Sequence, residues 1–382
     1  MRRVMCITGV RSEYFLQRSI FDAIMEHPDL ELELVVTGAH LSPLHGYSVQ
    51  QIEADGFPVV ARIESLLYTD RDAGRLKGAA AQLQVLAHLV DERRPDMLFA
   101  PTDREEALTL AMCGAYLGIP VVHYGAGDRS GHVDDQVRHA VSRLSQVLLA
   151  PHAEGVERLI KSGEEEWRVY NVGAAGLDRL HTTEKLSAEA LAKSLGVEGL
   201  EDEYIMVIQH PVSDDYEASG AHMAKILAAV DEAGYQAFIS YPNSDPGSES
   251  IIQVIESYRG NPKMHIFGNI PDIPFVNLLR GAACMVGNSS MSLVEAPMLK
   301  LPAIVVGNRQ ADRLHAGNVL YVDTSQAAIV KGLDKVFSDD NFRAQLTEVV
   351  SPYGDGRSGK RIAELLATLK LDGAMMNKAI SY

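Results

Sequence analysis

Short apolar runs alternate with longer stretches of helical periodicity along almost the whole chain, and this alternation limits the fold more than any other feature. The short runs are rich in β-branched residues, as strands buried on both faces usually are. Strands that alternate with helices in this way form parallel βαβ units. The expected strands are residues 4–8, 32–37, 59–63, 97–100, 120–124, 147–150 and 169–172 in a first series, and 204–208, 237–241, 264–267, 284–286, 303–306 and 319–322 in a second.

The two series of strands predict two domains. A polar, helix-rich connector at about 178–203 separates them, and a chain of 382 residues is too long for one comfortable core. We therefore expect an α/β fold of two doubly wound, Rossmann-like domains that face each other across a central cleft. The expected domains are 1–175, 176–360 and a final helix in 361–382 that returns to the first domain. Helical patterns between the strands include 15–26, 78–93 and 105–117.

The charge balance and the hydropathy pattern exclude several classes of protein. The sequence holds 51 acidic and 35 basic side chains, and its formal charge of -16 opposes binding to nucleic acids and to anionic membranes. Its apolar runs are shorter than the roughly 20 residues that cross a bilayer, and Met1 leads directly into a strand pattern. Cys6, Cys113 and Cys284 lie in apolar runs without metal-ligand or disulfide spacing, as in a reducing compartment. We expect a cytoplasmic protein whose cysteines are buried. Because the net charge is negative, we expect any anionic ligand to be held by hydrogen-bond donors and basic side chains within its own site.

One segment of the second half has the pattern of a phosphate site. The sequence Gly-Asn-Ser-Ser at 287–290 follows an expected strand and opens a helical pattern. The first amides of a helix have no partner inside it and carry partial positive charge, and the serine hydroxyls add donors. Glu295 stands near this helix start, and its carboxylate could accept hydrogen bonds from a ribose. The alternative is that Asn288 and Ser289 only cap the helix.

Two arginines follow the next expected strand. That strand leads into the loop 307–313, which contains Arg309, Gln310 and Arg313. An arginine guanidinium can donate two parallel hydrogen bonds to phosphate oxygens. In open parallel sheets, ligands bind beyond the carboxyl ends of the strands. The two neighbouring loops therefore predict one pocket for a diphosphate.

Neither the glycines nor the histidines of the first half indicate a cofactor. Residues 9–11, Gly-Val-Arg, end the first expected strand, but the G-x-G-x-x-G fingerprint is absent, which disfavours NAD and FAD. The spacing of His123, His132 and His139 matches none of the usual zinc patterns. We expect no bound metal.

Acidic residues follow two expected strands in the first half. Asp103 comes after the fourth strand, and Asp134 and Asp135 come after the fifth. These two aspartates stand four residues before Arg138 and His139, so each pair meets on one face if the segment is helical. Carboxylates beside arginine and histidine can be tuned for acid or base chemistry. The alternative is a surface helix whose capping aspartates pair with Arg138.

A series of ordered motifs carries a resemblance to a known family. The motifs are T-G-V-R-S-E-Y at 8–14, T-G-A-H-L at 37–41, D-R at 103–104, the segment 123–140 with its D-D-x-x-R-H-A run, V-G at 172–173 with L-D at 177–178, H-P at 210–211, N-S-D-P-G at 243–247, G-N-S-S to Glu at 287–295, G-N-R-Q to Arg at 307–313, and P-Y-G-D-G at 352–356. In these motifs the chain resembles the UDP-N-acetylglucosamine 2-epimerase family over nearly its full length. It is most similar to the hydrolysing branch that supplies sugars for sialic and legionaminic acid synthesis.

The resemblance implies an architecture, a substrate and a reaction. It implies a glycosyltransferase-B-like fold, a UDP-sugar substrate, no metal or redox cofactor, and a homodimer or homotetramer. The domain 1–175 would carry the acids beside the sugar, and the domain 176–360 would bind UDP. In this family a base removes the C2 proton while UDP leaves C1, giving a 2-acetamidoglycal to which the hydrolysing branch adds water. Such a step needs positioned carboxylates and donors for the departing diphosphate.

The resemblance also implies roles for individual residues. Asp178 would either touch the sugar or only brace the cleft. The implied catalytic residues are Asp103, Asp128, Asp134, Asp135 and His210. The implied substrate-binding residues are Arg11, His40, His123, Arg138, Asp178, Asn243, Asn288, Ser289, Ser290, Glu295, Arg309, Gln310 and Arg313.

One position departs from the family pattern. Many members carry an acid two residues after the histidine that corresponds to His123, and this chain has Gly125 there. Either Asp128 replaces the missing acid, or Asp134 is the base, or the substrate or activity differs. We expect the glycine to leave space beside the sugar, which would suit a bulkier substituent such as a 4-acetamido group.

The sequence motifs are compatible with three functions. The first is the hydrolysing epimerase, which releases UDP and free N-acetylmannosamine or its 2,4-diacetamido-6-deoxy analogue. The second is the non-hydrolysing epimerase, whose members usually show an E-E-x-N-R run where this chain has D-D-Q-V-R at 134–138. The third is a glycosyltransferase or a nucleotide-sugar binder with the same two-domain frame.

Overall fold

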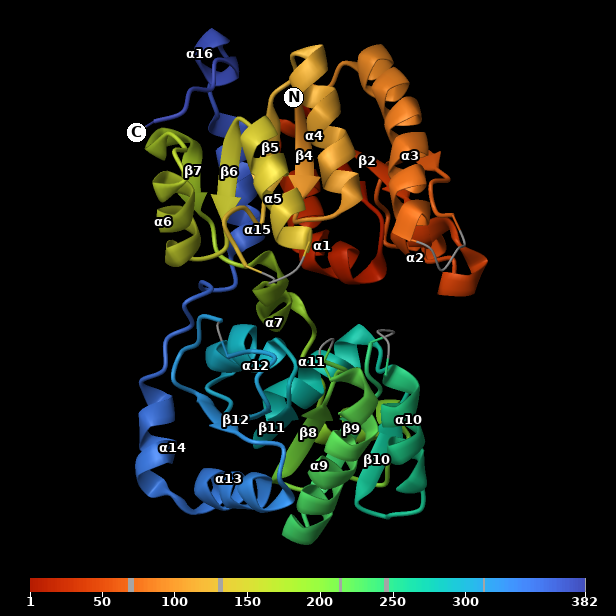
Figure 1. The fold of residues 1–382 in the computed structure, drawn as a ribbon, viewed down its shortest axis with the longest axis vertical. Coiled ribbons are helices and arrows are strands. Elements are labelled where there is room, and N and C mark those ends of the chain that lie inside the picture. Colours follow the sequence, from red (N-terminus) through yellow and green to blue (C-terminus); the bar gives the residue numbers. More distant parts are fainter. Residues whose placement is uncertain (68–71, 130–132, 213–214, 244–246, 312, 382) are drawn as a thin grey trace. The chain divides into compact units, whose positions relative to one another are not determined.

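The chain folds into two compact units (Figure 1). The computed structural model describes residues 1–67, 72–129, 133–212, 215–243, 247–311 and 313–381. Unit 1 consists of Met1–Asp178 and Tyr353–Tyr382, and unit 2 consists of Arg179–Pro352. Each unit is an α/β domain with a parallel sheet, which confirms the expected fold class.

Unit 1 is built on a parallel sheet of seven described strands, all of which lie where the sequence predicts them. Their order is β3-β2-β1-β4-β5-β6-β7, so the winding reverses between β1 and β4. Val4 pairs with Leu32 on one side and with Met97 on the other. The strands are β1 (Arg2–Thr8), β2 (Leu30–Thr37), β3 (Val59–Ile63), β4 (Met97–Pro101), β5 (Val121–Tyr124), β6 (Val147–Ala150) and β7 (Val169–Asn171).

Helices cover both faces of this sheet. They are α1 (Arg11–Glu26), α2 (Val49–Ala54), α3 (Asp72–Arg93), α4 (Glu105–Leu117), α5 (Val133–Leu144), α6 (Ala153–Lys161), α15 (Ser358–Thr368) and α16 (Gly373–Met376). Helices α1 and α15 contribute Ile24 and Ile362 to one buried cluster, and α3 and α4 contribute Leu86 and Leu110 to another. Because both faces are buried, the strands are apolar throughout. Helices α1 and α3 begin earlier than expected, since their polar first turns lack apolar periodicity.

Unit 2 repeats the same winding with six described strands. The order is β10-β9-β8-β11-β12-β13, and it reverses between β8 and β11. Its strands also lie where the sequence predicts them. They are β8 (Tyr204–Ile208), β9 (Gln236–Ser240), β10 (Met264–Phe267), β11 (Cys284–Gly287), β12 (Ala303–Val306) and β13 (Val319–Val322). The helices are α7 (Arg179–Thr182), α8 (Ala188–Leu195), α9 (Ser219–Ala233), α10 (Ser248–Ser257), α11 (Asp272–Gly281), α12 (Met291–Val294), α13 (Gln326–Ser338) and α14 (Asp340–Thr347).

The C-terminal segment is part of unit 1 from Tyr353 onward. Arg2 donates from Nη1 to the carbonyl oxygen of Leu366 at 2.8 Å. The carboxylate of Asp178 accepts hydrogen bonds from the amides of Ser358 (2.9 Å) and Gly359 (2.6 Å) at the start of α15. The units therefore divide after residues 178 and 352, whereas the sequence placed the divisions at 175 and 360.

The winding of each sheet defines where a ligand is expected. In doubly wound sheets, ligands bind outside the carboxyl ends of the strands at the point where the order reverses. These points lie between β1 and β4 in unit 1 and between β8 and β11 in unit 2. The three cysteines are buried inside the units. In the part of the chain that the structure describes, no helix is long and apolar enough to cross a membrane.

Candidate functional site

The reversal point of unit 1 encloses two buried carboxyl groups, Glu13 on α1 and Glu106 on α4. Glu13 is 3% exposed and accepts the Gly9 amide at 3.1 Å, while Glu106 is 2% exposed. A Cβ atom on Gly9, just after β1, would lie 1.9 Å from Oε1 of Glu106, so a larger residue there would force the Glu106 side chain to move. Burial, and then the charge of Glu106, raise the pKa of Glu13 to about 8. Burial also raises the pKa of Glu106, against the opposing charge of Arg104.

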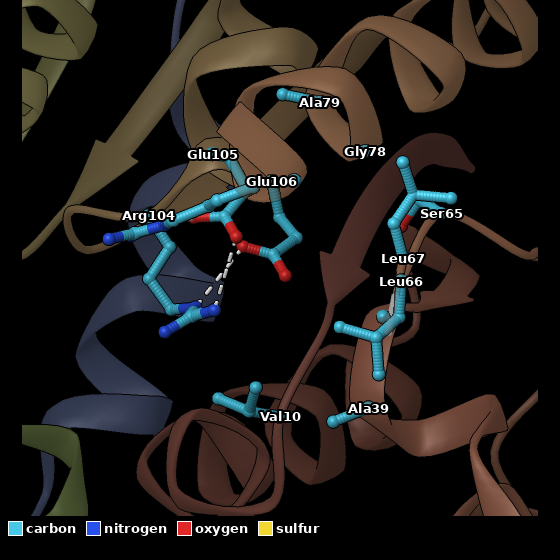
Figure 2. Close-up of a pocket in the computed structure, with 13 residues that line it drawn as sticks. Val10, Ala39, Ser65, Leu66, Leu67, Gly78, Ala79, Arg104, Glu105 and Glu106 are labelled. Atoms are coloured by element: carbon cyan, nitrogen blue, oxygen red, sulfur yellow. Dashed lines mark hydrogen bonds and ion pairs between the residues drawn. The ribbon is translucent and has the colours of Figure 1, made fainter. Parts of the chain in front are cut away.

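A cavity of about 360 Å³ opens beside Glu106 (Figure 2). Arg104 lies on one side, with its guanidinium 3.3 Å from Glu105 and 3.3 Å from Glu106. Leu66 and Leu67 lie on the opposite side in Figure 2, so the cavity has a charged wall and an apolar wall. The other lining residues are Val10, Gly38, Ala39, Ser65, Gly74, Arg75, Gly78 and Ala79.

Asp103 lies just after β4 and forms an ion pair with Arg138 of α5. Arg138 is 4% exposed and also contacts Asp135 at 3.1 Å. Burial raises the pKa of Asp103, and the charge of Arg138 opposes this rise. The structure therefore brings Asp103, Asp135 and Arg138 together at the carboxyl edge of the sheet.

Asp134 has a different partner from the one that its spacing suggested. It lies 3.5 Å from Arg75 of α3, and Arg75 also contacts Glu105 at 2.7 Å. Arg138 meets Asp135 three residues away rather than Asp134 four residues away, because its side chain turns inward toward Asp103. Residues 130–132 of this segment, including His132, lie outside the described residues.

Asp128 is held by a histidine. Its Oδ1 lies 3.1 Å from Nε2 of His152, whose Nδ1 accepts the Gly155 amide at 3.1 Å, so Nε2 is the donor. Burial raises the pKa of Asp128, but the hydrogen bonds from His152 and the Arg129 amide and the charge of Arg138 outweigh it and lower the pKa overall. Asp128 therefore stays ionised and is a poor proton donor.

His40 and His123 are both fully buried. His40 lies 3.1 Å from the Thr8 hydroxyl and 2.7 Å from the Ser48 hydroxyl, and burial lowers its pKa to about 4. His123 contacts the Thr102 carbonyl oxygen at 2.6 Å and the Ser142 hydroxyl at 3.0 Å, and burial lowers its pKa to about 3. The structure assigns both neutral rings to the support of loops around the site.

Gly125 does not leave open space. Its φ is +80°, and a Cβ atom there would lie 3.3 Å from the Cα atom of Thr102. The expectation of free room at this position was wrong, because the neighbouring loop after β4 already fills it. The glycine instead permits the left-handed turn that follows β5.

In unit 2, Asn288 joins the loops at the reversal point. Its Oδ1 accepts the His210 amide at 2.7 Å and its Nδ2 donates to the His210 carbonyl oxygen at 2.9 Å. Its own carbonyl oxygen accepts from Arg309 (3.1 Å) and Gln310 (2.9 Å). His210 Nδ1 in turn accepts the Asn243 amide at 3.1 Å. Asn288 is 0% exposed, so it holds the loops after β8, β11 and β12 together.

The helix after β11 is shorter than the sequence pattern indicated. Helix α12 is one turn long, and the amides of Ser292 and Leu293 already donate to the carbonyl oxygens of Ser289 and Ser290. Among the described residues, the amides of Ser289 and Ser290 have no backbone acceptor. The donors that this loop can offer to an anion are therefore these two amides and the two serine hydroxyls, rather than a long helix start.

Glu295 pairs with a residue that the sequence reasoning did not single out. It is 7% exposed and lies 3.1 Å from Arg179, which also contacts Asp272 at 3.1 Å. Burial raises the pKa of Glu295, and Arg179 opposes the rise. Arg179 therefore offsets the negative charge of Glu295.

The other expected site residues have varied surroundings. Arg11 is exposed at the start of α1, 5.9 Å from the Phe15 ring, and Arg313 is partly exposed. Asp178 is 4% exposed and holds the start of α15, as described above, which favours its bracing role. Residues 244–246 and 312 lie outside the described residues.

Sequence reasoning missed Glu13, Thr102, Glu106 and Arg179. Glu13 and Glu106 did stand in the motifs at 8–14 and after Asp103, but their burial was not visible in the pattern. A buried acid at a strand end becomes conspicuous only when its neighbours in space are known.

Comparison with known proteins shows relatives that match nearly the whole chain. A model of the family described as UDP-N-acetylglucosamine 2-epimerase matches residues 22–367. The chain is 30% identical over 382 residues to UDP-N,N′-diacetylbacillosamine 2-epimerase (hydrolyzing) of Legionella pneumophila, covering 100% of both chains. It is 31% identical over 369 residues to UDP-N-acetylglucosamine 2-epimerase of Neisseria meningitidis serogroup B, covering 96% of this chain and 95% of the relative.

A solved structure shows the same fold. UDP-GlcNAc 2-epimerase from Neisseria meningitidis bound to UDP-GlcNAc has a TM-score of 0.75 at 17% identity, covering 95% of this chain and 99% of that chain. The family model and the two relatives each span most or all of the sequence. This chain therefore belongs to the UDP-N-acetylglucosamine 2-epimerase family.

Proposed function

We propose that this UDP-sugar 2-epimerase is of the hydrolysing type. A carboxylate of unit 1 removes the C2 proton of a UDP-2-acetamido sugar while the bond between C1 and the diphosphate oxygen breaks. The electron pair of that bond leaves with UDP, and a 2-acetamidoglycal remains. Water then adds its hydroxyl to C1, and a proton returns to C2 on the opposite face. The products are UDP and the free 2-epimeric sugar.

The relative named as hydrolyzing supports the reaction type. The assignment of the base rests on the group of Asp103, Arg138 and Asp135 beyond β4. A base that accepts a proton from carbon works best with a pKa closer to neutral than that of an ordinary carboxylate. Burial raises the pKa of Asp103 in this direction, whereas Asp128 stays ionised against His152. We therefore assign the removal of the C2 proton to Asp103 and the second acid at the sugar to Asp134 or Asp135.

The loops of unit 2 supply the donors for the departing diphosphate. Ser289 and Ser290 offer hydroxyls and amides, and Arg309 and Arg313 offer guanidinium groups. Positive charge and donors aimed at the leaving oxygen stabilise the charge that develops there. His210 stands beside them, with its Nδ1 engaged and its neutral-form proton on Nε2.

Two observations favour a 2,4-diacetamido-6-deoxy sugar as the substrate. The Legionella pneumophila relative is named for UDP-N,N′-diacetylbacillosamine and as hydrolyzing. The cavity beside Glu106 has an apolar wall for methyl groups, formed by Leu66 and Leu67, and polar groups for an amide, on Ser65 and Arg104. UDP-GlcNAc has fewer methyl groups to place there.

Incubation in deuterated water tests the reaction. The purified chain is mixed with UDP-GlcNAc or with its 4-acetamido-6-deoxy counterpart, and the products are read by mass spectrometry and NMR. Free UDP together with deuterium at C2 of a manno-configured reducing sugar supports the proposal. A UDP-linked epimer would instead show the non-hydrolysing reaction, and no exchange with either substrate would contradict both.

A pair of alanine variants tests the substrate preference. Ala79 lines the cavity from α3, and its exposed neighbour Ala80 does not. Ala79→Met should fill the cavity and lower kcat/KM for the diacetamido substrate about tenfold more than for UDP-GlcNAc. Ala80→Met serves as the matched control and should leave the ratio unchanged. If Ala79→Met lowered kcat/KM equally for both substrates, the cavity would not distinguish the two sugars.

A further inference from the structure

Thr102 has an unusual backbone conformation. Its φ is +42°, and it is the residue immediately before Asp103. A β-branched side chain is strongly disfavoured at positive φ, because its Cβ substituents crowd the backbone. Residues in such conformations persist only where the surrounding structure holds them, and they concentrate at functional sites.

Three hydrogen bonds hold Thr102 in this conformation. Its amide donates to the carbonyl oxygen of Tyr124 at 2.8 Å. Its carbonyl oxygen accepts from Nε2 of His123 at 2.6 Å, and its hydroxyl donates to Oε1 of Glu13 at 3.3 Å. Every polar group of Thr102 is therefore engaged by a side chain or backbone from β5 or α1.

The partners of Thr102 are themselves fixed. Because Nε2 of the buried, neutral His123 donates to a carbonyl oxygen, Nδ1 accepts from the Ser142 hydroxyl at 3.0 Å. Ser142 belongs to α5, the helix that also carries Arg138, the cation beside Asp103. Glu13 receives the Gly9 amide with its other oxygen. Thr102 is thus connected on one side to the helix that holds the Asp103 counter-charge and on the other to the loop after β1.

The opposite loop is shaped to accept this turn. A Cβ atom on Gly125 would lie 3.3 Å from the Cα atom and 3.4 Å from Cγ2 of Thr102. Any side chain at 125 would therefore press on Thr102. The glycine and the left-handed threonine form one packed contact at the residue before Asp103.

We propose that Thr102 is a positioning residue that aims the Asp103 carboxylate, through its left-handed backbone and through the hydrogen bond from its hydroxyl to Glu13. This inference rests on the proposed role of Asp103 in proton transfer at C2. A glycine at 102 would adopt the same backbone without strain but would lose the hydroxyl bond. A serine would keep the hydroxyl and lack the second branch.

Substitutions of Thr102 separate this role from a structural one. Thr102→Gly should raise the melting temperature, because the backbone strain is released, and yet lower kcat for UDP release about tenfold with KM changed less than about twofold. Thr102→Val removes only the hydroxyl and should lower kcat to a similar extent. Thr102→Ser should keep kcat within about twofold of the unaltered chain.

A matched control is available on α15, where the exposed Thr368 donates its hydroxyl to the Glu364 carbonyl oxygen within the helix. Thr368→Val should change neither kcat nor KM. A variant that becomes more stable but slower cannot be explained by damage to the fold. If Thr102→Val and Thr102→Gly are folded and as fast as the unaltered chain, or if Thr102→Ser is as slow as they are, the positioning role is overturned. If the unaltered chain itself neither releases UDP nor exchanges deuterium, the proposed function fails and this inference fails with it.

Discussion

At the scale of single residues, two buried acids have raised pKa values at the reversal point of unit 1. Glu13 and Glu106 lie within the same reversal point, and Arg104 is the cation beside Glu106. Two carboxylates that share a buried site with one nearby cation cannot both ionise easily, so one keeps its proton. Burial and the charge of Glu106 raise the pKa of Glu13 to about 8, so Glu13 favours its protonated form near neutral pH. Its hydrogen-bond partner Thr102 is the residue before Asp103.

Glu13→Gln should change how stability depends on pH. Below the ordinary carboxyl range, folded and unfolded chains both hold the Glu13 proton. Between the ordinary carboxyl pKa and about pH 8, the unfolded chain releases the Glu13 proton while the folded chain keeps it. Glu13 therefore makes the free energy of unfolding fall as pH rises, and this fall ends above about pH 8. Glutamine has no proton to release. Melting temperatures of both proteins from about pH 5 to about pH 9 should therefore converge at low pH and differ most at high pH, and parallel curves would contradict the raised pKa.

At the scale of secondary-structure elements, the loops that meet at the reversal points need particular residues. The Gly287 φ is +135°, and a Cβ atom there would lie 2.1 Å from the Ile208 carbonyl oxygen. Strand β11 can therefore pass this close to β8 only with glycine. The sequence predicted every described strand, because strands buried on both faces show long apolar runs, but it did not predict that α12 is only one turn long.

Gly287→Ala should destabilise the chain by more than about 1 kcal/mol, because alanine fits neither the dihedral angle nor the space. Urea denaturation followed by circular dichroism measures the change. Gly199 is a suitable control, since a Cβ atom there would meet nothing within 4 Å. Equal stability of Gly287→Ala and Gly199→Ala would show that β8 and β11 can separate at low cost.

Helix α5 is held at its far end by the C-terminal segment. Lys378 donates to the carbonyl oxygens of Ser142 (2.6 Å) and Ser145 (2.8 Å) and lies 2.6 Å from Glu164, which is 1% exposed. A cation at the C-terminal end of a helix satisfies its last carbonyl groups and complements its dipole. The segment after α15 therefore supports the helix that carries Asp134, Asp135 and Arg138.

Lys378→Met should lower the free energy of unfolding by about 3 kcal/mol, because it leaves the buried Glu164 with only Arg143 at 2.9 Å. Denaturant titration measures the loss. The double variant Lys378→Met with Glu164→Gln should recover part of it, since the unpaired charge is then gone. No recovery would mean that the carbonyl contacts, and not the charge pair, carry the stabilisation.

At the scale of the whole molecule, the two units have the same winding but carry different functional groups at their reversal points. Unit 1 presents carboxylates at its reversal point, and unit 2 presents serines, amides and arginines. An elimination needs both a base at C2 and donors for the leaving group. Family membership and this division of residues together support the assignment of sugar chemistry to unit 1 and nucleotide binding to unit 2.

Variants in the two units should therefore have separable effects. Asp103→Asn should lower kcat roughly a hundredfold or more and leave the Kd for UDP unchanged. Arg313→Ala should weaken UDP binding about tenfold, whereas Arg343→Ala, on the exposed surface of α14, should not. Calorimetric titration with UDP and a coupled assay of UDP release measure these quantities. Loss of UDP affinity in Asp103→Asn equal to that in Arg313→Ala would contradict the division of roles.

The sequence by itself determined the strands, the parallel winding and the family, because apolar periodicity and ordered motifs are local properties of a chain. It also identified Asp103, Ser289 and Arg309 as residues that follow strands, and Arg138 as a helical partner of an aspartate. Only the tertiary structure decided their partners. Thr102 and Glu13 are 89 residues apart in the sequence and meet because β1 and β4 are neighbours in the sheet. Burial, pKa and backbone strain depend on such neighbours in space, which no local pattern specifies.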